Sequence, residues 1–520
     1  MNSLLCGLAA NPALPPELVD RLIALAVATP GPTDFFDPSD HLVSTLVRNL
    51  AERADLGPAQ VAALAARDED TAVQLARHGH LTAADVDPAV WPVVALALLD
   101  EGRGLPEWAR RFAADADPCV RLRLASCPGL PPEVEASLAA DPDVGVAAEL
   151  ALGTTSAPVA ARLARHQHAE VRRAVAYNEA VPPAALAALI TGHGVPPARS
   201  CLVCDSREIP FTHDPYCPDA DCDLPSGAEC DGTHGSTVHA TWQRALENPV
   251  TPPEAVVAFA DHPSMLLRWA LAERTDLPPH AYARLAEDPS PGVRSTLARN
   301  PGIGPEVIRV LAADSEHGIR RAVAHHPHVT LDVLTQLTAT TRLGAEALPR
   351  FASAPPAELA EAAGSAHAPL RMVVAHRHDL PPELRDALAA DPDASVVKAV
   401  APHPGLTQQQ LRAMVTRHGV QVLARVAANP DASAGLLAEL ARHDPPVRRA
   451  LREIATHPNA TAEALLPCLA DKRARIHAAA HPALPAAVVV ELLTDDDPQV
   501  VEAAAGNPSL PRAVMAELVP

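Results

Sequence analysis

The chain has 520 residues, more than one hydrophobic core usually organises, so we expect several domains or an array of repeats. Aromatic residues make up 2% of it although 48% of the residues are hydrophobic, which favours thin layers of Ala, Leu and Val over a core of large rings. The net charge of −21 argues against a general nucleic-acid or anionic-membrane surface. No stretch approaches the roughly 18 apolar residues of a membrane span, and the first residues do not resemble a signal peptide, so we expect a cytoplasmic protein without a membrane segment.

A repeat of about 26 residues fills residues 1–190. One copy, VRLRLASCPGLPPEVEASLAAD, begins at Val120. In each copy we expect a first helix that begins after an Asp-Pro pair and ends near an Asn-Pro or His-Pro pair, because a residue before proline is forced out of the helical region. A second helix is expected to begin at Pro-Pro-Glu, where proline suits the opening turn. Helices this short are unstable alone, so the pattern predicts a solenoid in which neighbouring repeats stabilise one another.

Two polar positions recur in the repeat. An arginine follows the apolar residue that opens the first helix, and an Asn or His stands where that helix ends. We interpret the arginines as a ladder that bonds an Asp of the same or the next repeat, with a track for phosphates or acidic peptides as the alternative. The Asn or His position is interpreted as a structural turn. The arginines are Arg121, Arg172, Arg268, Arg294, Arg320, Arg371 and Arg448, and the turn residues are Asn11, His78, Asn178, Asn248, Asn300, His326, His403, Asn429, His457, His481 and Asn507.

Residues 191–243 interrupt the repeat and contain five of the nine cysteines. This polar insert cannot bury enough apolar surface to order itself, so we expect a metal ion to hold it. Two residues separate one pair of cysteines and four separate the next, spacings that suit a tetrahedral zinc site whose binding energy is the folding energy. The first choice of ligands is Cys201, Cys204, Cys217 and Cys222.

The end of the insert favours a second kind of centre. The pentapeptide from Cys230 to His234, CDGTH, is similar to the closing pentapeptide of CDGSH iron-sulfur domains, which hold a [2Fe-2S] cluster with three cysteines and one histidine. The resemblance implies Cys230 and His234 as ligands, so an iron-sulfur cluster is the alternative to zinc. Two parts of the family pattern are absent: no Cys-x-Cys precedes the pentapeptide, and the proline expected two residues before Cys230 is Pro225 instead.

The repeat resumes over residues 244–520, with clear copies that begin at Val293 and Ile319. The alternation DPxxxVRxxLAxNPxLPPExxxxLA resembles the leucine-rich repeat variant (LRV) family, which implies an α-helix paired with a second short or 3₁₀ helix in a right-handed superhelix. HEAT repeats also carry an Asp followed by Val-Arg, so the handedness stays open. We therefore expect an all-α solenoid superhelix of about 18 two-helix repeats. Its segments are N-terminal repeats (1–190), a Cys-rich metal-binding insert (191–243) and C-terminal repeats (244–520).

The sequence predicts a non-enzymatic scaffold that binds an unidentified protein or peptide along the curved face of the solenoid. No combination of Ser, His and Asp stands out, and no acidic general base accompanies the cysteines as an open catalytic zinc site needs. Two alternatives stay open. One is an iron-sulfur redox or sensing protein on a helical-repeat scaffold, and the other is nucleic-acid binding through the arginine row.

Overall fold

The computed structural model describes residues 3–29, 38–202, 204–205, 234–343, 348–352 and 354–519. These residues form 35 α-helices, two 3₁₀ helices and one isolated β-bridge, and they contain no β-strand. Successive short helices form the two-helix repeats that the sequence predicts, so the all-α solenoid of two-helix repeats is confirmed. Within the described ranges, no helix is long and apolar enough to cross a bilayer.

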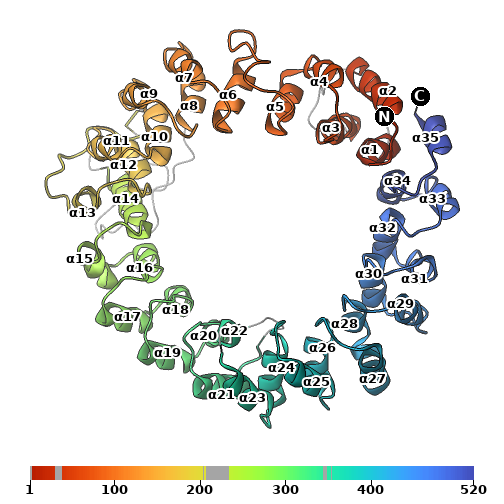
Figure 1. Cartoon of the computed structure of the whole chain (residues 1–520). Helices are drawn as coiled ribbons and strands as arrows, with labels where there is room; N and C mark the ends of the chain where they lie inside the picture. The colour runs from red at the N-terminus through yellow and green to blue at the C-terminus, as the bar shows by residue number, and fades with distance from the viewer. Residues whose placement is uncertain are drawn as a thin grey trace. The chain divides into compact units, whose positions relative to one another are not determined.

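The chain packs as two compact units. The terminal unit contains Met1–Leu81 and Gly344–Pro520, and the central unit contains Thr82–Leu343. In both units the first helices of successive repeats pack against one another, and the second helices form a parallel layer beside them (Figure 1). These two units are defined by packing. The three segments predicted from the sequence, 1–190, 191–243 and 244–520, are defined by the repeat pattern and stay a prediction.

The central unit contains the cysteine-rich insert between α13 and α14. Its first helices are α6 (Pro92–Asp100), α8 (Pro118–Ala125), α10 (Val144–Gly153), α12 (Ala169–Ala176), α14 (Gly235–Glu247), α16 (Met265–Ala272), α18 (Pro291–Leu297) and α20 (His317–Ala324). Its second helices are α7 (Pro106–Ala113), α9 (Pro132–Leu138), α11 (Ala157–Leu163), α13 (Pro183–Thr191), α15 (Pro253–Val256), α17 (Pro279–Ala286), α19 (Pro305–Ala312) and α21 (Leu331–Thr340). The 3₁₀ helix η1 (Val257–Asp261) continues α15.

The terminal unit joins both ends of the chain, because α1 packs between α34 and α3. Its first helices are α1 (Ser3–Ala10), α3 (Pro38–Ala51), α5 (Glu69–Arg77), α22 (Pro349–Ala352), α24 (Ala368–Ala375), α26 (Ala394–Val400), α28 (Leu423–Ala427), α30 (Arg448–Ala455), α32 (Lys472–Ala480) and α34 (Pro498–Ala505). Its second helices are α2 (Pro16–Ala28), α4 (Pro58–Ala65), α23 (Pro356–Ala363), α25 (Pro382–Ala389), α27 (Gln408–His418), α29 (Ala434–Ala441), α31 (Ala462–Cys468), α33 (Ala486–Leu492) and α35 (Arg512–Leu518). The 3₁₀ helix η2 (Gly419–Gln421) follows α27.

Local sequence signals set the ends of these helices. The carboxylates of Asp117 and Asp393 accept backbone N–H bonds at the starts of α8 and α26, as a capping residue does. The second helix α9 begins at Pro132, with Glu133 in its first turn near the positive end of the helix dipole. In α19, Val307, Ile308 and Leu311 are buried on one face. The predicted start of the second helix at Pro-Pro-Glu is therefore confirmed.

Most residues at the Asn or His position bond their repeat to the neighbouring one. Asn300 Nδ2 donates to the carbonyl oxygens of Ala272 (2.7 Å) and Arg274 (2.6 Å) in the preceding repeat. His326 takes the same place one repeat later, with its Nε2 2.8 Å from the carbonyl oxygen of Asn300. The predicted structural role is thus confirmed for the members that make these bonds, whereas His403 is buried without a side-chain hydrogen-bond partner among the described residues and His78 is exposed. The same bonds are made by Asn11, Asn178, Asn248, Asn429, His457, His481 and Asn507.

The arginine row forms ion pairs with aspartates of the next repeat. Arg294 donates through Nε and Nη2 to both carboxylate oxygens of Asp314 (2.7 and 3.3 Å), and its Nη1 donates to the carbonyl oxygen of Asp288. Its side chain is 15% exposed, so the predicted structural ladder is confirmed here and the guanidinium is not presented to a phosphate. Equivalent pairs, also 20 residues apart, are Arg121–Asp141, Arg268–Asp288, Arg371–Asp391 and Arg475–Asp495. Arg320 donates to Thr341 instead, and Arg448 is exposed.

Candidate metal centre

Three of the predicted metal ligands, Cys201, Cys204 and His234, lie together where the insert leaves and rejoins the stack. Cys201 Sγ lies 3.5 Å from Cys204 Sγ, which lies 3.6 Å from His234 Nδ1, and the three ligand atoms are all within 4.8 Å of one another. A tetrahedral zinc ion would separate two sulfurs by about 3.8 Å and a sulfur from an imidazole nitrogen by about 3.6 Å. Two of the three separations are therefore close to those of a tetrahedral zinc site, and the three side chains form a group that could hold a metal ion.

The backbone before α12 fixes the position of the two cysteines. An isolated parallel bridge joins His168 to Ser200, in which Ala169 N–H donates to the Ser200 carbonyl (2.9 Å) and Arg199 N–H to the Gln167 carbonyl (2.8 Å). Cys201 follows directly and is buried. The start of the insert is thus anchored to the repeat stack by main-chain hydrogen bonds.

A carboxylate ties the second cysteine to the same anchor. Asp205 follows Cys204, and its Oδ2 lies 3.0 Å from Nε2 of the buried His168. Its Oδ1 accepts a hydrogen bond of 2.6 Å from the Ser200 hydroxyl. These two contacts hold the backbone beside Cys204 against the start of α12.

His234 approaches from the far end of the insert with an unusual backbone. Its φ of 57° lies in the left-handed region, and it is the one non-glycine residue of the described ranges with a positive φ. Such a conformation costs on the order of 1–3 kcal/mol and persists where the surroundings require it. His234 directly precedes α14 and is buried, but its side chain does not cap that helix. The left-handed turn instead accompanies the approach of its ring to Cys204.

The remaining predicted ligands, Cys217, Cys222 and Cys230, lie outside the described residues. A closed tetrahedral site needs one more ligand beside Cys201, Cys204 and His234, and these cysteines are the candidates for it. The complete ligand set stays a prediction. Of the other histidines near the insert, His239 lies inside α14 and its Nε2 is 2.8 Å from the Ser264 hydroxyl, so it belongs to the helix packing.

The cysteines of the repeats have a different environment. Burial raises the pKa of Cys6 to about 11 and the pKa values of Cys127 and Cys468 to about 12, so these thiols stay protonated as small apolar groups. Cys119 is exposed in α8. The scattered cysteines thus provide packing or surface positions, whereas the described cysteines of the insert converge with a histidine.

Comparison with known proteins adds little to this picture. No family model matches the chain, and no curated protein matches it. Among solved structures it is similar to importin beta, crystallised in ammonium sulfate, at 12% identity and a TM-score of 0.21 over 94% of this chain. The match spans 62% of the importin beta chain. It is also similar to an engineered protein of the Northeast Structural Genomics Consortium at 16% identity and a TM-score of 0.11, over 97% of this chain and 98% of that one. The chain is a helical-repeat protein on the evidence of its own stacked repeats.

Proposed function

We propose that the protein is a non-enzymatic scaffold that binds another protein or a peptide through the first-helix layer of its central unit. A metal ion, zinc in the first instance, holds the insert to the stack beside this layer. The function and the metal are those that the sequence predicts, and the first-helix layer is the surface that we expect to contact the partner.

The observation that carries the proposal is that three successive first helices, α12, α14 and α16, each present an aromatic or cationic side chain at the surface. Tyr177, at the end of α12, is 56% exposed, and Trp269 on α16 is 39% exposed. The Arg244 guanidinium, on α14 between these helices, lies 5.5 Å from the centre of the Tyr177 ring. Trp, Tyr and Arg are the residues most enriched at the energetic centres of protein interfaces. Exposed on a rigid stack, they suit the binding of a folded or extended polypeptide.

The nature of the donor atoms supports zinc as the metal. Two thiolates and an imidazole are ligands that structural zinc sites use, and the Cys201–Cys204 and Cys204–His234 separations are close to those of a tetrahedral site. The alternative iron-sulfur cluster would use His234 together with Cys230, so both proposals share that histidine. Elemental analysis and the visible absorbance of anaerobically purified protein distinguish them, because zinc is colourless and a [2Fe-2S] cluster absorbs in the visible.

The arginine row does not support nucleic-acid binding as a second function. Arg294, a central member of the row, has both sides of its guanidinium engaged by Asp314 and a carbonyl oxygen. The acidic charge of the chain acts in the same direction.

Paired substitutions test the proposed surface. The double variant Tyr177→Ala/Trp269→Ala should lose at least tenfold in affinity for a partner captured by the unmodified protein. The matched control is Val310→Ala, which removes an exposed apolar side chain (52% exposed) from the second helix α19. Equal loss in both variants, or loss in neither, contradicts the proposed surface.

Cys201→Ser/Cys204→Ser should abolish stoichiometric metal, and unchanged metal content would contradict the choice of ligands.

A further inference from the structure

Three arginines of the row, Arg172, Arg320 and Arg448, lack the aspartate that the others use, and of these Arg172 combines burial with a nitrogen that has no partner in the described part of the chain. The pairs Arg121–Asp141, Arg268–Asp288 and others place the carboxylate 20 residues after the arginine. Twenty residues after Arg172 stands Gly192, at the end of α13 where the insert begins. The repeat that carries the insert has therefore kept the cation and lost its counter-ion.

The guanidinium of Arg172 is turned to other partners as a result. Its Nε donates to the carbonyl oxygen of His166 (2.6 Å) and its Nη1 to the carbonyl oxygen of Pro196 (2.8 Å). Among the described residues, its buried Nη2 has no hydrogen-bond partner. The residue is 8% exposed, and burial lowers the pKa of the guanidinium. The nearby Glu170 is already bonded by Arg173.

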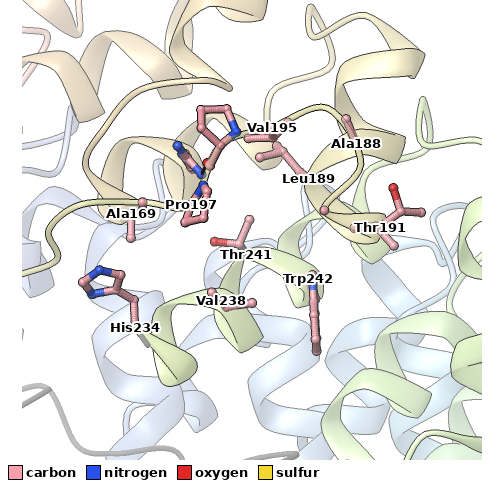
Figure 2. A pocket seen from close by; sticks show the side chains of 15 residues that line it. Ala169, Ala188, Leu189, Thr191, Val195, Pro197, His234, Val238, Thr241 and Trp242 are labelled. Atoms are coloured by element: carbon pink, nitrogen blue, oxygen red, sulfur yellow. Dashed lines mark hydrogen bonds between the residues drawn. The ribbon is translucent and has the colours of Figure 1, made fainter. Parts of the chain in front are cut away.

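Arg172 lines a cavity of about 400 Å³ between α12, α13 and α14. Figure 2 shows the apolar wall: Leu189 and Val195 on one side face Val238 and Trp242 of α14 on the other. The described residues that line the cavity include no Asp or Glu, and apart from Arg172 their one ionisable side chain is His234. A buried cation in an apolar cavity, with no carboxylate beside it in the part of the chain that the structure describes, is electrostatically incomplete, because burying an unpaired charge is costly.

We infer that this cavity binds a small-molecule carboxylate, a single negative charge on a compact apolar body. The carboxylate replaces the missing aspartate at Arg172, and the apolar body lies between α13 and α14. The site uses none of the side chains Tyr177, Arg244 and Trp269 of the proposed partner surface.

The lining selects the class of ligand. A volume of about 400 Å³ lies within the usual range of small-molecule sites, roughly 300–1,000 Å³, which combine apolar walls with a few polar groups. The guanidinium of Arg172 carries a single positive charge, which one carboxylate balances. A phosphate needs several donors to offset its larger charge, and the remaining walls are mostly Ala, Leu, Ile, Val and Pro.

Octanoate and octanol, titrated into the full-length protein as purified with its metal, test the inference. Octanoate should bind with one-to-one stoichiometry and at least tenfold more tightly than octanol, which has the same chain without the charge. Trp242 lines the cavity, so binding should change its fluorescence, and Trp242→Phe should remove that change. Arg172→Met should weaken octanoate at least tenfold and leave octanol unchanged.

A second pair of variants applies even if Arg172→Met does not fold. Gly192→Asp returns a carboxylate to the position 20 residues after Arg172, and Gly192→Asn is its uncharged match. Gly192 has a φ of +71°, a conformation that Asp and Asn tolerate better than most residues, and an added Cβ meets nothing within 4 Å. Gly192→Asp should block octanoate and Gly192→Asn should not. The inference is overturned if the unmodified protein does not bind octanoate at millimolar concentration, binds octanol equally well, or responds alike to both Gly192 variants.

Discussion

Asn11 Nδ2 donates a hydrogen bond of 2.9 Å to the carbonyl oxygen of Asn507, a residue 496 positions away in the chain. A second bond of the same length goes to the carbonyl oxygen of Ala505. Asn507 in turn bonds the carbonyl oxygens of Ala479 and His481 in the repeat before it. The first repeat therefore packs on the last one through the same hydrogen bonds that join consecutive repeats in the rest of the terminal unit.

Asn11→Ala should destabilise the terminal unit. The substitution removes two buried hydrogen bonds to carbonyl oxygens, a loss of about 1–3 kcal/mol, although the Asn507 carbonyl keeps its bond from the Leu510 N–H. Asn11→His is the matched variant and should lose less, because histidine fills this position at His457 and His481 and bonds one carbonyl oxygen through Nε2. Urea unfolding followed by circular dichroism measures both. An Asn11→Ala midpoint equal to that of the unmodified protein would show that the two ends do not stabilise each other.

Gly7 provides an independent test of the same contact. An added Cβ at Gly7 would lie 2.2 Å from the Glu502 carbonyl oxygen and 2.9 Å from Ala505 Cβ, so α1 could not keep its distance from α34. We expect Gly7→Ala to lower the melting temperature by several degrees. Gly153→Ala at the end of α10 is the control, since its Cβ meets nothing within 4 Å and alanine favours a helix. Equal melting temperatures for the two variants would rule out close packing at Gly7.

Most of the repeat fold is predictable because its signals are local. The Pro-Pro-Glu start of α9 and the Asp cap of α8 act within one turn of helix, and the Asn or His position recurs at a fixed interval. The contact of Asn11 with Asn507 is not predictable in this way. Similar repeats offer similar surfaces, so the sequence does not indicate that the first repeat packs on the last.

The site was predictable in part for the same reason. Cys201 and Cys204 form a local pair with metal-ligand spacing, and CDGTH singles out His234. That these three meet depends on the path of the insert, which no local pattern encodes. The missing partner of Arg172 is not evident from the sequence pattern either. An alignment of the repeats by their arginines places Gly192 where other repeats have Asp. That difference has a meaning only once the structure shows that each arginine pairs with the aspartate 20 residues after it.

Acid should destabilise the terminal unit through His403. This side chain is fully buried, and burial followed by the nearby His378 lowers its pKa from 6.5 to about 4. Below pH 6.5 the unfolded chain takes up a proton at this histidine, whereas the folded protein does so only near pH 4. The free energy of unfolding is therefore highest above pH 6.5 and decreases as the pH falls toward 4. One pKa unit corresponds to about 1.4 kcal/mol, so the loss is on the order of 3 kcal/mol.

His403→Asn isolates this contribution, because asparagine fills the same position at Asn429 and does not titrate. The unfolding midpoints of both proteins at pH 7.5 and pH 4.5 give the comparison. The unmodified protein should lose more stability between the two values than His403→Asn does. His376, whose pKa burial also lowers to about 4, remains in both proteins and accounts for a residual loss. The same loss in both proteins would exclude His403 as the source.

Removal of the metal should release the insert and leave the helices intact. Asn248 Nδ2 bonds the carbonyl oxygens of Ala176 and Asn178 at 3.0 Å, and α14 packs directly against α12, so the stack continues across the insert without depending on it. A strong chelator should therefore leave the far-ultraviolet circular dichroism unchanged. Trypsin cleavage after Arg207, the one Lys or Arg between Cys201 and Trp242, should accelerate because metal binding supplies the ordering energy of the insert. Asn248→Ala should have the opposite effect: the helical stack should become less stable while the metal content stays unchanged. Loss of helix on chelation would mean that the metal supports the repeats themselves, and an unchanged cleavage rate would mean that it does not hold the insert.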